Sequence, residues 1–198
     1  VCFDEVSGIS FDSKDGVNMM KGYMESGEFS RGKEAIRADG GVVLLGNFDV
    51  DVEHQQRISH LFGPLPKEMR DDTAFMDRIH SFLPGWDFPK MNKLNLTTHF
   101  GLVSDFLSES WMHLRNINRV TSVLGRIDYG GALSGRDTSA VNKTLNGLLK
   151  LMQPDPSEPI SDELLEWAIK ISLEYRRRVK EQQKRIGSAE YRNTHFSY

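Results

Sequence analysis

The chain of 198 residues is 38% apolar and carries a formal net charge of −3. This length allows one large domain or two small ones with a real hydrophobic core, whereas the weak negative charge excludes a protein that coats nucleic acid with its whole surface. The single cysteine, Cys2, excludes an internal disulfide and suits a reducing compartment. Because no apolar run approaches the ~20 residues of a membrane span, we expect no membrane contact and a cytoplasmic location.

The chain opens on VCFDEV, a run typical of a buried strand that ends in two carboxylates, Asp4 and Glu5. Such a strand suits nucleotide hydrolysis, because the aspartate can hold the water shell of Mg²⁺ and the glutamate can polarise the attacking water. The pattern is short enough to arise by chance and needs support from other parts of the chain. Since no methionine precedes Val1, we expect the gene to begin upstream of it.

After a helical stretch, the segment ESGEFSRGKEAIRADGG predicts a strand, a tight turn at Lys33-Glu34 and a return strand. In length and layout this hairpin resembles the one that MCM helicases project toward DNA in their central pore. Arg31, Lys33 and Arg37 are then the candidates for contacts with DNA phosphates. The alternative is a surface hairpin whose cations pair with nearby acidic residues.

Two polar residues follow further along the chain. The strand-like run VVLLGNFD contains Asn47 at its end, and FMDRIHSFLPGW places Arg78 after a short helix. In ring-shaped ATPases a polar residue beside the Asp-Glu strand positions the lytic water, and an arginine reaches the nucleotide of the neighbouring subunit. Simpler interpretations stay open: Asn47 can be a turn residue, and Arg78 can pair with Asp72 or Asp77.

The second half of the chain is predicted to be helical. Apolar residues recur at helical spacing over 98–119 and 139–152, and prolines in QPDPSEP prevent the second helix from continuing. A third helix is expected between an N-cap at Ser161 and a stop at Gly187. Its basic run YRRRVKEQQKR is most simply a solvated helix face.

The order FDEV, LLGNFD and DRIHSFLPGW resembles the latter part of an AAA+ ATPase module. DRIHSFLPGW is also similar to the arginine-finger region of Lon-type proteases, and SGRDTSAVNKTLNGLLKL strengthens a resemblance to the BrxL family, the Lon-related proteins of bacterial BREX phage-defence systems. The resemblance implies an α/β fold: the parallel-sheet part of an AAA+ core with an inserted β-hairpin, followed by an α-helical lid.

The resemblance also implies a role for each polar residue, with ATP and Mg²⁺ as cofactors. Asp4 and Glu5 correspond to Walker B, with Asp4 holding Mg²⁺ through water, Asn47 corresponds to sensor 1 and Arg78 to the arginine finger. Sensor 2 is open between Lys143, which precedes an x-Leu in the lid helix, and Arg136, which is the stronger phosphate ligand. We favour Arg136 on its chemistry.

Three regions follow from the resemblance: the later part of the core at 1–90, the lid at 91–187, and the start of a linker to a Lon-like domain at 188–198. No G-x-x-x-x-G-K-[ST] motif occurs in the sequence, and no Ser-Lys pair has the context of a protease dyad. The chain alone is therefore predicted to be inactive.

For the parent protein the resemblance implies an ATP-driven ring motor, expected to be a hexamer, that acts on DNA in phage defence together with other BREX proteins. The alternative is the ATPase module of a Lon-like protease that unfolds protein substrates. A third possibility is a non-enzymatic assembly module.

Overall fold

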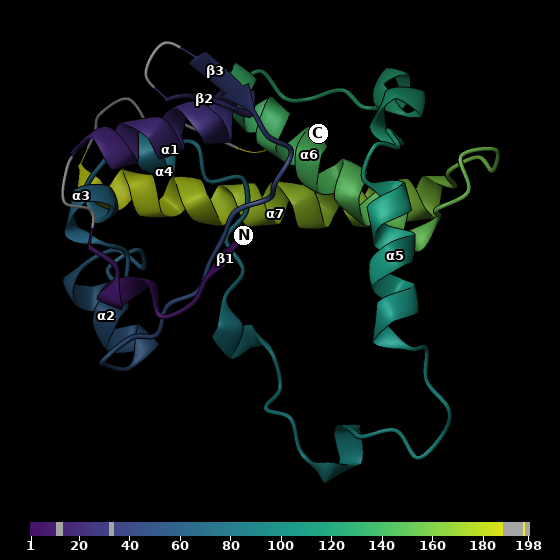
Figure 1. Ribbon diagram of the computed structural model, residues 1–198, viewed down its shortest axis with the longest axis horizontal. Helices are drawn as coiled ribbons and strands as arrows, with labels where there is room; N and C mark the ends of the chain where they lie inside the picture. The colour runs from purple at the N-terminus through teal and green to yellow at the C-terminus, as the bar shows by residue number, and fades with distance from the viewer. Residues whose placement is uncertain (11–13, 32–33, 188–195, 197–198) are drawn as a thin grey trace.

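The long helix α7 is the axis on which the other elements are arranged in the computed structural model, which describes residues 1–10, 14–31, 34–187 and 196 (Figure 1). The strands are β1 (Cys2–Phe3), β2 (Glu28–Arg31), β3 (Glu34–Arg37) and β4 (Val43–Leu44). The α-helices are α1 (Lys14–Ser26), α2 (Val52–Ile58), α3 (Lys67–Arg70), α4 (Thr73–Met76), α5 (Ser104–Leu114), α6 (Gly135–Met152) and α7 (Asp162–Ile186). The predicted α/β class is confirmed.

Strands β1 and β4 form a parallel pair, with Cys2 opposite Val43 and Phe3 opposite Leu44. The ladder continues beyond the strands, since the amide of Leu45 donates to the carbonyl of Phe3 at 2.9 Å. The prediction of buried strands is wrong here, because Val43 is 51% exposed. The physical reason is that, within the described residues, β1 and β4 have only each other as sheet neighbours.

Strands β2 and β3 form the expected antiparallel hairpin. Arg31 pairs with Glu34, so Glu34 belongs to the return strand and not to the turn where we expected it. The hairpin rests on α1, where the ring of Phe29 meets Tyr23 edge-on with the ring centroids 6.2 Å apart. Strand β3 is exposed along its whole length, so the hairpin forms an outer layer above α1 (Figure 1).

Two hydrophobic cores lie along α7. The first, beneath α1, α3 and α4, contains Val6, Val17, Phe62, Leu65, Met69, Phe75, Met76 and Val179. The second, between α6 and the first half of α7, contains Val120, Val123, Val141, Leu145, Leu149, Ile160, Leu165, Ala168, Ile169 and Leu173. Helix α7 thus packs against both halves of the chain, and the expected boundary at residue 90 stays a prediction.

The ends of the two longest helices follow from their capping residues. Helix α7 begins after Ser161, whose hydroxyl accepts from the amide of Leu164, and ends at Gly187 with φ of 95°, as predicted. Helix α6 begins at Gly135, four residues before the predicted start. The cause is a capping box in which Ser134 and Asp137 bond each other's backbone amides.

Helix α5 is shorter than the predicted helix at 98–119 and spans Ser104–Leu114. Three of its apolar residues are exposed, namely Phe106 at 63%, Trp111 at 55% and Met112 at 58%, whereas Leu107 and Leu114 are half-buried. Lys150 joins the end of α5 to α6 by donating to the Leu114 carbonyl at 2.9 Å. Among the helices of the described residues, none combines the length and the apolar character needed to cross a membrane.

Candidate functional site

Asp4, Glu5 and Asn47 lie at one edge of the β1–β4 pair. Both strands run in the same direction, so the residues that follow them emerge at the same edge of the sheet. All three residues are exposed. Glu5 has a left-handed backbone, with φ 48° and ψ 50°, and its amide donates to Asp4 Oδ1 at 2.9 Å. The residues that we predicted as Walker B and sensor 1 therefore lie at the same edge of the sheet.

This edge of the sheet suits a hydrated Mg²⁺ ion. Asp4 and Asn47 offer oxygen ligands, which Mg²⁺ prefers, and the ion usually keeps several of its waters. The described residues contain no group of three or more His, Cys, Asp or Glu side chains placed to hold a metal ion directly. The arrangement fits the predicted contact of Asp4 with Mg²⁺ through water, which stays a prediction.

Arg78 lies directly after α4, which begins at the N-cap Asp72. Its Nη1 donates to the carbonyl of Ala74 at 2.7 Å, and its Nε donates to Glu25 Oε2 at 3.0 Å. The ion-pair partner of Arg78 is thus Glu25 and not Asp72, which instead pairs with Lys21 at 2.8 Å. The simple local pairing that we considered from sequence is not the one that forms.

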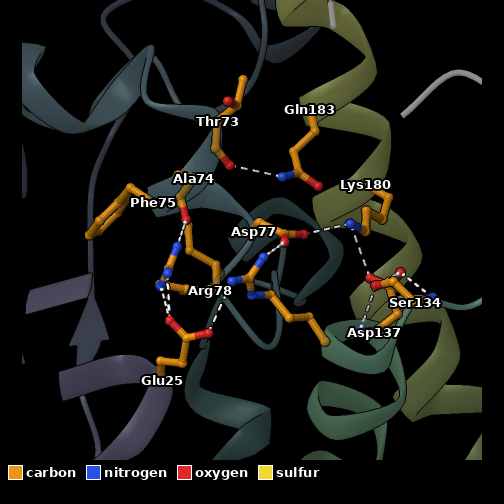
Figure 2. Close-up of polar contacts among 12 residues, drawn as sticks. Glu25, Thr73, Ala74, Phe75, Asp77, Arg78, Ser134, Asp137, Lys180 and Gln183 are labelled. Carbon is orange, nitrogen blue, oxygen red and sulfur yellow. Dashed lines mark hydrogen bonds and ion pairs between the residues drawn. The ribbon is translucent and has the colours of Figure 1, made fainter. Parts of the chain in front are cut away.

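Arg136, one of the two sensor 2 candidates, contacts the same carboxylate. Its Nη2 donates to Glu25 Oε1 at 3.0 Å, and its Nη1 donates to Asp77 Oδ2 at 3.3 Å. Hydrogen bonds from Arg136 and Arg78 hold the pKa of Glu25 below its usual value. Figure 2 shows Glu25 facing Arg78 across these contacts. The structure therefore brings two predicted phosphate-sensing arginines onto one acidic residue.

Lys143, the other sensor 2 candidate, contacts a different group. Its Nζ lies 3.2 Å from Nε2 of His80. Burial lowers the pKa of His80 to about 4, and the charges of Lys143 and Arg176 act in the same direction. At neutral pH the imidazole is therefore uncharged and can accept a hydrogen bond from the lysine. Of the two candidates, Arg136 is the one that shares a partner with Arg78.

Behind these arginines lies a buried charge network that joins α7 to α6 and to the end of α4. Arg176, which is fully buried, donates from Nε to Asp137 Oδ1 at 2.8 Å and from Nη2 to Asp77 Oδ1 at 3.0 Å. Lys180 contacts Asp77 Oδ1 at 2.5 Å and Asp137 Oδ1 at 3.2 Å (Figure 2). The network places two cations and two carboxylates in a buried position.

The buried cations oppose the effect of burial on both carboxylates. Burial alone would raise the pKa of Asp77, but the hydrogen bond from Lys180 and the charge of Arg176 hold it below its usual value. For Asp137, burial is likewise outweighed by Ser134 and by the same two cations, so its pKa is lowered as well. Both aspartates are therefore ionised at neutral pH.

The sequence pattern does not reveal this network, because the basic run in α7 is most simply interpreted as a solvated face. That interpretation is wrong for Arg176 and Lys180, which are 0% and 2% exposed. The available signal was their spacing: both lie on the helical stripe that contains Leu173 and Val179. Arg177, between them in sequence, is exposed and pairs with Glu174.

Two of the three DNA-contact candidates, Arg31 and Arg37, lie on the described strands of the hairpin, but not together. Arg31 ends β2 opposite Glu34, whereas Arg37 ends β3 opposite Glu28, so the two occupy opposite ends of the ladder. Arg37 is exposed. Lys33 lies outside the described residues. Arg37 therefore lies at the base of the hairpin, away from the predicted basic tip.

The chain is similar to known proteins over almost its whole length. Residues 1–197 match the family described as "Lon-like protease BrxL-like, ATPase domain". The chain belongs to this family. It is 43% identical over all 198 residues to "Lon-like protease BrxL" of Escherichia coli O9:H4 (strain HS) and 42% identical to the protein of the same name from Bacillus cereus (strain H3081.97).

These matches confirm the resemblance to the BrxL family that the motif order indicated. Membership of a BrxL-like ATPase-domain family implies nucleotide binding. The chain spans 28% of the length of the E. coli relative and 29% of the B. cereus one. The roles of single residues, the Mg²⁺ ion, the DNA substrate and the partners stay predictions.

Proposed function

We propose that this chain is the part of an ATP-driven BrxL-type ring motor that positions the lytic water and senses the γ-phosphate. The observation that carries this proposal is the convergence of Arg78 and Arg136 on Glu25, an exposed anionic group. A pair of permanent, planar cations that converge on one anionic group is the arrangement that stabilises the charge of a phosphoryl group in transfer. The family match to an ATPase domain supports it independently.

The proposed mechanism divides the polar residues between two subunits. At the edge of the β1–β4 pair, Asp4 would hold the water shell of Mg²⁺, which would offset the charge of the phosphates, while Glu5 polarises the attacking water and Asn47 orients it. Arg78 stabilises the developing charge on the nucleotide of the neighbouring subunit. Head-to-tail contact of this kind closes a ring, which we propose to be a cytoplasmic hexamer.

DNA is the substrate that we favour for the motor. Strand β3 is exposed throughout and Arg37 faces solvent, so the hairpin is available to a partner. One subunit contributes three candidate cations, and six copies around a pore would give a strongly salt-dependent site. In this proposal the motor acts on phage genomes, and other BREX proteins are its partners.

Protein unfolding for an attached Lon-like protease is the second candidate function. It is favoured by the name of both relatives, "Lon-like protease BrxL". The two functions differ in what the hairpin contacts, so variants of the hairpin separate them.

The deciding experiment compares DNA binding by the full-length protein and its Arg31→Ala/Lys33→Ala/Arg37→Ala variant across a salt series, with ATP and with none. We expect weaker binding and a shallower salt dependence in the variant, because fewer phosphate contacts release fewer counterions. A matched control removes three other cations, through Lys67→Ala/Lys90→Ala/Lys93→Ala at exposed positions. Equal binding by all three proteins would overturn the DNA function and favour protein unfolding.

A further inference from the structure

Glu25 is bound by two guanidinium groups at once. Arg78 contacts one carboxylate oxygen through Nε at 3.0 Å and Nη2 at 2.5 Å, and Arg136 contacts the other oxygen through Nη2 at 3.0 Å. The three residues come from α1, from the end of α4 and from the start of α6. The side chains of Glu25 and Arg136 are accessible, at 46% and 50% exposed, whereas that of Arg78 is 16% exposed.

Each arginine also has an anchor that does not depend on Glu25. Arg78 donates from Nη1 to the Ala74 carbonyl, and Arg136 donates from Nη1 to Asp77. Asp77 is itself held by the buried Arg176 and Lys180. Both guanidinium groups would therefore keep their positions if the Glu25 carboxylate were removed.

We propose that Glu25 is an internal substitute for phosphate, occupying a two-arginine anion site until a phosphoryl group displaces it. This inference rests on the proposed function, which supplies the phosphoryl group from the neighbouring subunit's nucleotide. A phosphoryl group carries more charge than a carboxylate and offers three acceptor oxygens, and guanidinium groups bind phosphate in two-pronged fashion. The exchange breaks and forms only hydrogen bonds and ion pairs.

The same geometry assigns Arg136 to the nucleotide that Arg78 serves. Two guanidinium groups that reach the two oxygens of one carboxylate can also reach oxygens of one phosphoryl group. Arg136 is thus a sensor of the neighbour's nucleotide and not of the nucleotide held by its own subunit. Glu25 acts as a positioning residue that sets how readily both arginines are released to that nucleotide.

The test uses the nucleotide-free full-length protein and inorganic phosphate as the probe. Thermal unfolding is followed as phosphate replaces chloride at constant ionic strength, for wild type, Glu25→Gln, and Glu25→Gln/Arg136→Ala. Glu68→Gln is the charge-matched control, because Glu68 is exposed on the neighbouring short helix α3. Any other phosphate site of the protein is common to all four and cancels in the comparison.

We expect Glu25→Gln to bind phosphate about tenfold more tightly than wild type, which corresponds to ~1.4 kcal/mol. The added Arg136→Ala change should remove this gain, and Glu68→Gln should match wild type. The Glu25→Ala variant should show the same gain in phosphate affinity as Glu25→Gln. Agreement between the two excludes a folding defect that is specific to one of them. The proposal is overturned if Glu25→Gln gains no more phosphate affinity than Glu68→Gln. It is also overturned if the gain persists when Arg136→Ala is added. Because the readout needs no hydrolysis and no DNA, its failure is distinct from failure of the motor function.

Discussion

The buried guanidinium of Arg176 is bonded to the carboxylate of Asp137, with 2.8 Å between Nε and Oδ1. This contact joins α7 to the first turn of α6. The same guanidinium donates to the backbone carbonyls of Asp77 and Ile79, the residues on either side of Arg78. The buried network thus fixes the backbone from which the candidate arginine finger extends, and it connects the finger to both long helices.

Replacing Arg176 should therefore destabilise the protein. We expect Arg176→Met to cost about 3–5 kcal/mol, because it leaves Asp77 and Asp137 ionised and buried with only part of their compensation. Hydrogen exchange of α6 and α7 amides in the full-length protein measures the loss. Arg177→Met removes the neighbouring exposed arginine and should cost less than about 1 kcal/mol. Equal effects of the two changes would show that the buried network contributes no special stability.

The two buried aspartates also predict sensitivity to acid. Their pKa values are lower in the folded protein than in the unfolded chain, so their contribution to stability is complete above about pH 4 and is lost as the pH falls through the folded pKa values. Unfolding temperatures measured from pH 6 to pH 2 test this. The Asp137→Asn variant should be less stable than wild type at pH 6, but its unfolding temperature should fall less than that of wild type below pH 4. Parallel curves for the two proteins would contradict the prediction.

His80 predicts a separate effect at higher pH. Its pKa is lowered to about 4 by burial and by the nearby cations, whereas an unfolded histidine titrates near 6.5. The unfolded chain therefore binds the proton first, and stability should fall as the pH drops from about 6.5 to about 4. His80→Gln, which stays neutral and can still accept from Lys143, should flatten this part of the curve of unfolding temperature against pH. An unchanged slope between pH 6.5 and 4 would show that His80 titrates normally.

Local signals explain the parts of the fold that the sequence predicted well. Ser161 and Gly187 define α7, because a hydroxyl that accepts an amide and a residue tolerant of positive φ act over a few positions. Strands β1 and β4 likewise lie within two short apolar runs, whereas their parallel pairing follows from the family resemblance and not from the runs. The exposure of Phe106 on α5 did not follow from its pattern, because periodicity identifies an apolar face but not what covers it.

Only those residues of the candidate site that belong to short sequence motifs could be predicted from the sequence. Asp4, Glu5 and Arg78 have recognisable neighbours in sequence, and their roles stay predictions. Glu25 has no such neighbours, since its partners Arg78 and Arg136 lie 53 and 111 residues away. Long-range ion pairs of this kind depend on how helices pack, which no local pattern encodes.

Hydrolysis of ATP by the full-length protein separates the residue roles. Arg78→Ala should lower kcat by about 10³–10⁵, the usual contribution of an arginine finger. Arg136→Ala should lower it as well, whereas Lys143→Ala, whose amine contacts His80 and not Glu25, should stay near wild type. Loss of activity in Lys143→Ala with none in Arg136→Ala would reverse the assignment of sensor 2.

Mixing inactive variants shows which residues act across the subunit boundary. Glu5 lies at the edge of the β1–β4 pair, whereas Arg78 lies on the surface that carries Glu25. The variants Glu5→Gln and Arg78→Ala therefore damage two different surfaces. If Arg78 acts on the neighbour, rings mixed from these two variants contain some interfaces with both residues intact and should regain part of the activity. Arg136→Ala mixed with Glu5→Gln should recover in the same way. Arg78→Ala mixed with Arg136→Ala should not, because both changes damage the same surface, so every interface lacks one arginine. Recovery in this last mixture would show that Arg136 serves its own subunit's nucleotide.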